Sequence, residues 1–145
     1  MTVGTNDALW RGPFGDDYVE RNAVSPLYEK RGLFWKAFIE KYKSESVLEV
    51  GCGVGGNLRH IEVNWLVGMD VNRNALDLAV TPNVDTVWEG TVNAIPLPDG
   101  MFSLVFSVGV LIHVAPADVV KAIQEMFRVS SKHVALMEYQ ADEDI

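Results

Sequence analysis

The sequence predicts an α/β fold in which helices cover both faces of a parallel β-sheet. Short apolar segments typical of buried strands alternate along the chain with segments of helical periodicity. A glycine-rich turn follows the first of these strands, as in sheets that bind a ligand at the carboxyl ends of their strands. A chain of 145 residues, 48% of them apolar and 22% charged, is sufficient for one domain with its own core.

We divide the chain into an N-terminal arm, residues 1–24, and the α/β domain, residues 25–145. The arm carries three aromatic side chains that would be unusual in a free tail, namely Trp10, Phe14 and Tyr18. A helix is expected to begin at Ser25-Pro26, because a serine hydroxyl caps a helix and proline suits its first position. This helix should run to about Lys43, with Gly32 as a potential break.

Strands and helices are expected to alternate after this first helix. We place strands at residues 46–50, 65–70, 84–88, 103–108 and 132–139. We place further helices from about Gly56, near residues 72–80 and over residues 116–129. The last helix has one apolar face, which consists of Val119, Val120, Ile123, Met126 and Phe127. In such a sheet the loops that leave the carboxyl ends of the strands lie along one edge, so we expect a single ligand site there.

The turn after the first strand fits two different glycine motifs. Gly51, Gly53 and Gly56 match G-x-G-x-x-G, which is typical of dinucleotide binding. Gly51, Gly53 and Gly55 match G-x-G-x-G equally well, and both spacings allow an anion to approach the backbone. Glu49 favours the second motif, because a carboxylate at this place would repel a pyrophosphate. It suits S-adenosylmethionine, which carries an ammonium and a sulfonium group and no phosphate.

An acidic residue, Asp70, ends the second predicted strand, 19 residues after Gly51. A carboxylate at this place can accept hydrogen bonds from both hydroxyls of a ribose, and it serves NAD and S-adenosylmethionine alike. It therefore indicates an adenosine-type ligand without choosing between them. Capping of the next helix is the alternative role for Asp70.

The segment from Glu89 to Ser107 completes a recognisable pattern. Together with E-x-G-x-G-x-G and the acid at the strand end, its I-P-L-P-D-G turn and the following F-x-L-V-F-S resemble class I S-adenosylmethionine-dependent methyltransferases. The resemblance runs in order from about Val47 to Tyr139. It implies a Rossmann-like sheet and methyl transfer from the sulfonium to a nucleophile. It also implies the cofactor contacts, for which we select Glu49, Gly51, Cys52, Gly53, Asp70, Val71, Thr91, Val92 and Ser107.

Two positions depart from the family pattern. Where the family often has Gly-Asp-Ala, this chain has Gly90-Thr91-Val92, and the missing aspartate commonly contacts the adenine amino group. Thr91 can accept a hydrogen bond but carries no charge. Where Phe-Asp-Leu-Val is usual, Ser103 takes the place of the aspartate, at a position that is more often structural.

Three further segments, Phe14–Asn22, Gly109–Val114 and Glu138-Tyr139, resemble a narrower group. They are similar to the methyltransferases associated with pseudaminic acid biosynthesis, which accompany surface or flagellar sugar pathways in bacteria. This resemblance suggests a sugar or sugar-nucleotide acceptor and a role in carbohydrate biosynthesis. On the arm, Tyr18 could close over the cofactor and Arg21 could pair with its methionine carboxylate, although a solvated charge is the alternative for Arg21.

His113 is the candidate general base, because it follows the fourth predicted strand on the ligand edge. A histidine packed under the loop and bonded to backbone is the alternative. Tyr139 ends the fifth strand on the same edge and is expected either to line the acceptor pocket or to lie on its rim. His60 and His133 have no neighbours at metal-ligand spacing, so we expect both at the surface and no metal site. Cys52 is expected to be a small side chain that fills a tight space and contributes its backbone to the ligand.

Composition excludes several classes of function. A net charge of −8 argues against a nucleic-acid partner and favours a small-molecule acceptor. A single cysteine rules out an intramolecular disulfide. No apolar run approaches the length of a membrane span and no signal peptide is recognisable, so we expect a cytoplasmic protein without a membrane partner.

The class I fold usually continues past its fifth strand with a β-hairpin, which this sequence does not contain. The last strand would then be an open and fairly apolar edge, with Val134, Leu136 and Met137. We expect a truncated chain or a second chain, either another copy or a different partner, that covers this edge. Two rival functions stay open: a non-catalytic module that retains the cofactor pocket, and an NAD-dependent oxidoreductase.

Overall fold

The centre of the protein is a five-stranded parallel sheet with the strand order β3-β2-β1-β4-β5. The structure, a computed structural model, describes residues 5–138, so Tyr139 lies outside the described residues. The strands are β1 (Ser46–Val50), β2 (Trp65–Asp70), β3 (Thr86–Glu89), β4 (Phe102–Val108) and β5 (Ser130–Met137). The predicted α/β fold and the order of its strands along the chain are confirmed.

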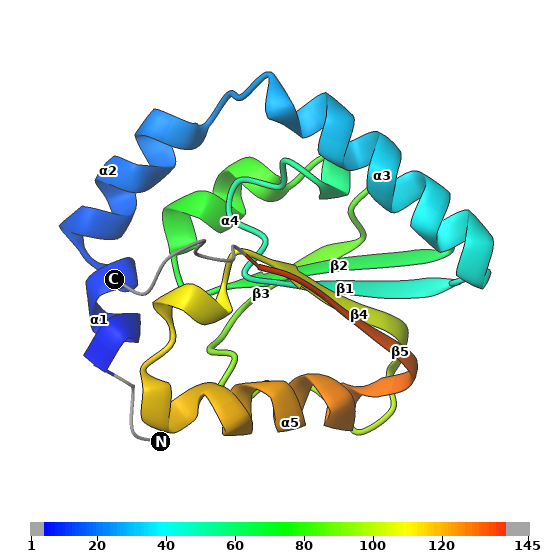
Figure 1. The fold of residues 1–145 in the computed structure, drawn as a ribbon. Coiled ribbons are helices and arrows are strands. Elements are labelled where there is room, and N and C mark those ends of the chain that lie inside the picture. Colours follow the sequence, from blue (N-terminus) through cyan, green and yellow to red (C-terminus); the bar gives the residue numbers. More distant parts are fainter. Residues whose placement is uncertain (1–4, 139–145) are drawn as a thin grey trace, which may run out of the picture.

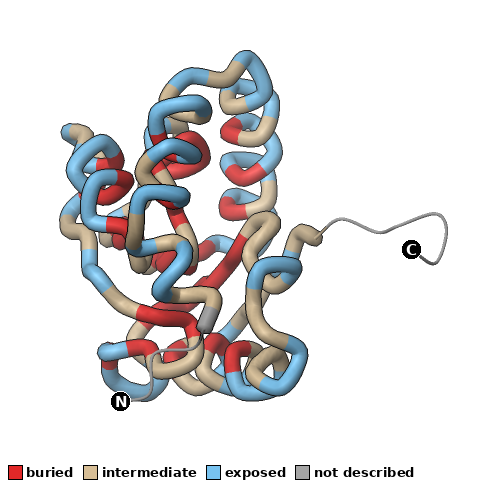
Figure 2. Tube along the Cα trace, turned by 90° about the vertical axis from the view of Figure 1, so that its left-hand side faces the viewer, coloured by how far each residue is buried: buried red, intermediate tan, exposed pale blue. Residues whose placement is uncertain are grey.

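Helices cover both faces of this sheet (Figure 1). On one face lie α3 (Leu27–Tyr42) and α4 (Arg73–Ala79), and on the other lies α5 (Val119–Val129). The central strands β1 and β4 are buried on both faces, as expected of a parallel sheet between helices. Figure 2 shows the buried residues along the strands and on the inner sides of the helices.

The long helix α3 begins after Ser25, whose side-chain oxygen accepts a hydrogen bond from the Leu27 backbone N–H at 3.3 Å. Gly32 does not break this helix. It allows a close contact with His60, because a Cβ at Gly32 would lie 2.3 Å from the His60 side chain. On the inner side of α3, the Trp35 ring stacks on Phe106 of β4 with 4.1 Å between the ring centroids.

The helix expected from about Gly56 is absent from the described residues, and this prediction is wrong. A single 3₁₀ turn, Leu58–His60, follows the glycine loop, and β2 begins soon afterwards at Trp65. The segment between β1 and β2 must leave the sheet and return to it within a short length of chain. It is therefore too short to contain an α-helix as well. The carbonyls of Leu58 and Ile61 accept hydrogen bonds from the Asn83 side-chain amide, at 2.6 and 2.8 Å.

The helix α5 is rotated relative to the expected apolar face. Its buried residues are Ala122, Met126 and Val129, whereas Val120 and Phe127 are 66% and 62% exposed. Arg128 fixes this rotation, because its guanidinium donates to the carbonyls of Ile95 and Leu97 and to the carboxylates of Asp99 and Glu125. The same contacts hold the I-P-L-P-D-G turn against α5.

The N-terminal arm is helical where it is described, with α1 (Thr5–Arg11) and α2 (Pro13–Asn22). Both helices lie across the carboxyl edge of the sheet (Figure 1). The Asn72 side-chain amide joins them to α4, since it donates to the Trp10 carbonyl at 2.9 Å and to Asp16 Oδ1 at 3.0 Å. The Arg11 guanidinium lies 3.1 Å from the Glu89 carboxylate at the end of β3. The arm therefore covers the edge at which the sequence places the ligand.

None of the described helices combines the length and the apolar character that a membrane crossing requires.

Candidate functional site

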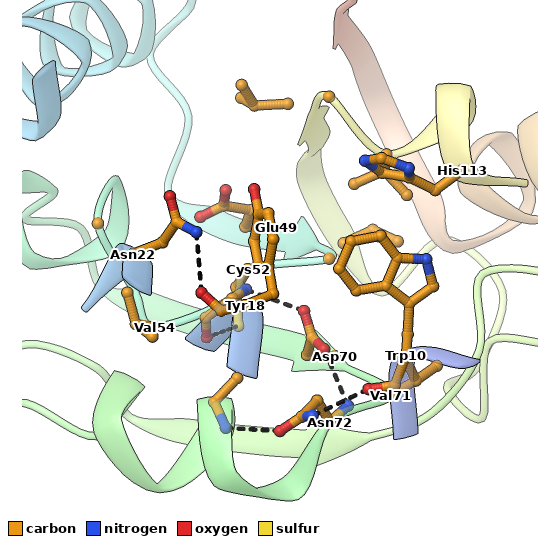
Figure 3. A pocket seen from close by; sticks show the side chains of 18 of the residues that line it. Trp10, Tyr18, Asn22, Glu49, Cys52, Val54, Asp70, Val71, Asn72 and His113 are labelled. Atoms are coloured by element: carbon orange, nitrogen blue, oxygen red, sulfur yellow. Dashed lines mark hydrogen bonds between the residues drawn. The ribbon is translucent and has the colours of Figure 1, made fainter. Parts of the chain in front are cut away.

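A cavity of about 340 Å³ opens at the carboxyl edge of the sheet. It lies between the glycine loop, the helices α1 and α2, and the turn that follows β4 (Figure 3). Its volume lies within the range of small-molecule sites. The cavity brings together most of the predicted site residues: Tyr18, Glu49, Gly51, Cys52, Gly53, Asp70, Val71, Val92 and His113.

The glycine loop adopts the G-x-G-x-G form. Gly51, Gly53 and Gly55 have left-handed backbone conformations, with φ of +70°, +54° and +78°. Gly56 does not have a positive φ; it allows close packing against the ring of Tyr28, which a Cβ would meet at 2.5 Å. Gly53 has open space where a Cβ would lie, so its backbone is accessible from the cavity.

Asp70 connects the end of β2 to the glycine loop. Its Oδ2 accepts a hydrogen bond from the Gly53 backbone N–H and its Oδ1 accepts one from the Asn72 N–H, both at 2.9 Å. Burial raises the pKa of Asp70, and these backbone donors oppose that effect. The cap of α4 is instead Asn72, whose Oδ1 accepts from the Ala75 N–H at 2.9 Å. The capping alternative for Asp70 is therefore wrong, and Asp70 lines the cavity.

Glu49 is the buried carboxyl group of the cavity. It is 2% exposed, and its Oε1 accepts a hydrogen bond from Asn57 Nδ2 at 2.7 Å, while its Oε2 is buried without a partner among the described residues. Burial raises the pKa of Glu49 to about 8. Arg31 of α3 donates from Nε to Asn57 Oδ1 at 3.1 Å and also lines the cavity. A guanidinium and an acidic oxygen thus stand at the same end, an arrangement that suits a zwitterionic amino acid group.

The opposite end of the cavity is formed by Trp10 and His113 (Figure 3), whose ring centroids are 4.6 Å apart. The His113 side chain lines the cavity, whereas a position under the loop was the alternative. Desolvation lowers the pKa of His113, and the charge of Glu138 opposes this effect, so the imidazole is a free base near neutral pH. Asp7 also lines the cavity, and its Oδ2 is buried without a partner in the described part of the chain.

Three predicted site residues lie elsewhere. Arg21 is exposed on α2, where its Nε donates to the Asp17 carbonyl of the same helix at 3.3 Å. Thr91 is buried behind the lining residues Gly90 and Val92. Ser107 is fully buried in β4 and does not line the cavity. Cys52 lines the cavity as a buried thiol whose pKa is raised by burial.

Sequence reasoning missed several lining residues: Asp7, Trp10, Asn22, Tyr28, Arg31, Asn72 and Val110. Three of them carried a local signal. Asn72 follows the strand-end acid at the position of a helix cap. Tyr28 and Arg31 are spaced to share one face of a helix, and the Arg31 guanidinium lies 5.5 Å from the Tyr28 ring centroid.

Within residues 5–138, no group of three or more His, Cys, Asp or Glu side chains is placed to hold a metal ion.

Comparison with known proteins gives a family match and several similar folds. The family described as "Methyltransferase domain" matches residues 48–137. The YcgJ protein of Bacillus subtilis is 24% identical with a TM-score of 0.64, over 79% of this chain and 52% of that one. CalS10 of Micromonospora echinaspora, a S-adenosylmethionine-bound amino pentose methyltransferase of calicheamicin biosynthesis, is 17% identical with a TM-score of 0.74, over 88% and 58%. A S-adenosylmethionine-dependent methyltransferase of Aquifex aeolicus is 19% identical with a TM-score of 0.64, over 89% and 77%. These likenesses establish the fold, and the chain spans about half the length of the YcgJ protein.

Proposed function

The chain belongs to the methyltransferase-domain family, the class I S-adenosylmethionine-dependent enzymes, and we propose that its cavity transfers a methyl group to a small-molecule acceptor. The observation that carries the proposal is Glu49, a buried carboxyl group in a cavity that also contains the open glycine loop; one oxygen of Glu49 has no partner within residues 5–138. An acidic group beside that loop favours a cationic ligand over a pyrophosphate.

The methionine part of the cofactor is proposed to lie at the Arg31 end of the cavity. Glu49 Oε2 accepts a hydrogen bond from the ammonium group, and Arg31 pairs with the carboxylate. Asn57 fixes the side chains of Glu49 and Arg31 relative to each other, because it is hydrogen-bonded to both of them. This assignment replaces Arg21 with Arg31 as the partner of the carboxylate.

The adenosine part is proposed to lie along Asp70. The Asp70 carboxylate accepts hydrogen bonds from the ribose hydroxyls, and Val71 packs beside the sugar. Gly90 and Val92 line the far side and offer an apolar surface to the adenine. Thr91, which lies between Gly90 and Val92, and Ser107 of β4 are buried away from the cavity and make no cofactor contact in this proposal.

His113 is proposed to be the general base. Bound S-adenosylmethionine would supply an electrophilic methyl group to an oxygen or nitrogen atom of the acceptor. His113, neutral because desolvation lowers its pKa, takes the proton that the acceptor loses. Trp10 and Tyr18 exclude water and hold the acceptor in position.

For the acceptor we propose a sugar or sugar nucleotide. The ring of Trp10 offers an apolar face to a sugar. Asp7 Oδ2, which has no partner in the described part of the chain, can accept a hydrogen bond from a hydroxyl or amino group. The segments that resemble the pseudaminic acid-associated group, Phe14–Asn22 and Gly109–Val114, both border the cavity. The similar fold of CalS10, whose acceptor is an amino pentose, is consistent with this proposal.

The test is methyl transfer from labelled S-adenosylmethionine into a panel of sugars, amino sugars and sugar nucleotides. Transfer of label to one of them, lost in His113→Gln, supports the enzyme. A protein that binds S-adenosylhomocysteine but methylates nothing in the panel or in a bacterial metabolite extract would favour the non-catalytic module.

The outer edge of β5 is proposed to pair with a second chain, either another copy or a different partner. No described strand pairs with this edge, and Leu136 of β5 is 41% exposed. Light scattering of the purified chain distinguishes the two cases, because a dimer indicates a second copy. A monomer that does not change mass with concentration would remove self-association.

A further inference from the structure

We propose that Glu138 is a positioning residue for the proposed reaction, because it fixes the turn that places Val110 on the glycine loop and His113 in the cavity. The inference rests on the proposed function. Glu138 immediately follows β5 and does not itself line the cavity. It therefore acts through the residues of the turn.

The turn leaves the sheet at Gly109. There the β4–β5 ladder ends with a hydrogen bond from the Gly109 N–H to the Met137 carbonyl at 2.8 Å, and Gly109 has a φ of +63°. The next two N–H groups, of Val110 and Leu111, have left the ladder. Both donate to Glu138 Oε1, each at 3.2 Å. One carboxylate oxygen thus replaces the strand partner that the turn has lost.

The turn held by Glu138 contacts the glycine loop and carries His113. The side chain of Val110 occupies the space beside Gly51, because a Cβ at Gly51 would lie 2.4 Å from Val110 Cγ2. The 3₁₀ turn Leu111–His113 continues from there, and the His113 N–H donates to the Val110 carbonyl at 3.0 Å. Movement of the Val110 backbone would therefore displace the glycine loop contact and the candidate base together.

Glu138 also contributes charge. Its Oε2 is buried without a hydrogen-bond partner among the described residues, and its charge opposes the desolvation that lowers the pKa of His113. Of the other ionisable groups near this end, Asp7 of α1 and Tyr18 of α2 line the cavity, and Arg11 of α1 is paired with Glu89. Neutralising Glu138 should thus lower the pKa of His113 further.

Two variants separate position from charge. Glu138→Gln keeps an oxygen that can accept from Val110 and Leu111 but removes the charge, whereas Glu138→Ala removes both. Glu45→Gln is the control, because Glu45 is exposed at the opposite end of the sheet, just before β1. The readouts are S-adenosylhomocysteine affinity by calorimetry and the pKa of the His113 imidazole by NMR titration, with His113→Gln to assign its resonances.

For Glu138→Gln we expect a lower His113 pKa and an affinity within about twofold of the unchanged chain. For Glu138→Ala we expect about tenfold weaker affinity, because two charge-assisted hydrogen bonds are lost. An unchanged His113 pKa in Glu138→Gln, or unchanged affinity in a folded Glu138→Ala, would overturn the inference. If the unchanged chain binds no S-adenosylhomocysteine, the proposed function fails, and the His113 titration still decides the role of Glu138.

Discussion

The two ends of the cavity are built in different ways. At the end proposed for the cofactor, Glu49, Asn57 and Asp70 lie close together in the sequence and hydrogen-bond one another or backbone, while Glu49 Oε2 has no partner among the described residues. At the end proposed for the acceptor, Trp10 and His113 come from segments that are distant in sequence. Asp7, which also lines the cavity, has one oxygen without a partner among the described residues. Each end thus offers an oxygen that a ligand must satisfy, but hydrogen bonds within one stretch of the chain hold the first end, whereas contacts between distant segments build the second.

The largest effect that distinguishes the two ends is expected from removal of the proposed base, His113. His113→Gln should lower the rate of methyl transfer by a factor of about 10³, which is within the usual contribution of a general base. S-adenosylhomocysteine affinity should stay within about twofold, because His113 belongs to the acceptor end. His133→Gln is the matched control, since His133 lies against Tyr42, away from the cavity, with ring centroids 4.9 Å apart. Equal losses in the two variants would argue against a base at position 113.

The complementary change disables the cofactor end. Asp70→Ala should weaken S-adenosylhomocysteine binding about 100-fold, since it removes the acceptor of two ribose hydroxyls and leaves the Gly53 and Asn72 N–H groups unpaired. Calorimetry measures the affinity. Asp77→Ala is the control on the exposed side of α4, where Asp77 forms an ion pair with Arg73. Unchanged binding in Asp70→Ala would show that the ribose lies elsewhere.

Substitution of two arginines tests which of them binds the carboxylate of the methionine part of the cofactor. Arg31→Met should weaken S-adenosylhomocysteine binding about tenfold, the usual effect of losing one charge-assisted hydrogen bond. Arg21→Met should change it less than twofold, because Arg21 is exposed on α2 and bonds only to its own helix among the described residues. The reverse result would restore the prediction from sequence and contradict the cavity geometry.

The smallest expected effect is a pH dependence at the cofactor end. Burial raises the pKa of Glu49 to about 8, so its carboxyl group is mostly protonated at pH 7, whereas an ammonium group binds the ionised form. S-adenosylhomocysteine affinity should therefore rise about fivefold from pH 7 to pH 8. In Glu49→Gln this rise should disappear, and a rise that persists would assign it to another group.

The same carboxyl group affects stability with a definite sign. The folded chain keeps the Glu49 proton up to about pH 8, whereas the unfolded chain releases it near the ordinary value of 4.5. The Glu49 contribution to the free energy of unfolding is thus fully present below that value and is lost as the pH rises toward 8. Thermal melting from pH 5 to pH 8 should show a smaller loss of Tm in Glu49→Gln than in the unchanged chain.

The sequence predicted the cofactor end better than the acceptor end for a physical reason. Glu49, Gly53 and Asp70 are placed by two adjacent parallel strands, and strand ends can be read from short apolar segments. Trp10 reaches the cavity only because α1 and α2 fold over the sheet edge, and no local pattern shows where a helix pair docks. Asn72 and Asp16 decide that docking through contacts between distant segments.

The differences between the predicted positions and the structure have equally specific causes. Ser107 lies near a strand end, but side chains alternate along a strand and this one points into the core. Arg21 belongs to α2, which borders the cavity, but its side chain is exposed and bonds to the backbone of its own helix. The missing helix after Gly56 reflects the short distance to β2, which a motif alone does not reveal.

The most direct test of the central claim is calorimetric titration of the purified chain with S-adenosylmethionine and S-adenosylhomocysteine, with NADH as the control ligand. A cavity with a buried acid beside an open G-x-G-x-G loop predicts micromolar binding of the first two and no detectable binding of NADH. Tight binding of NADH, with no heat from either sulfur compound, would contradict the assignment of the cavity.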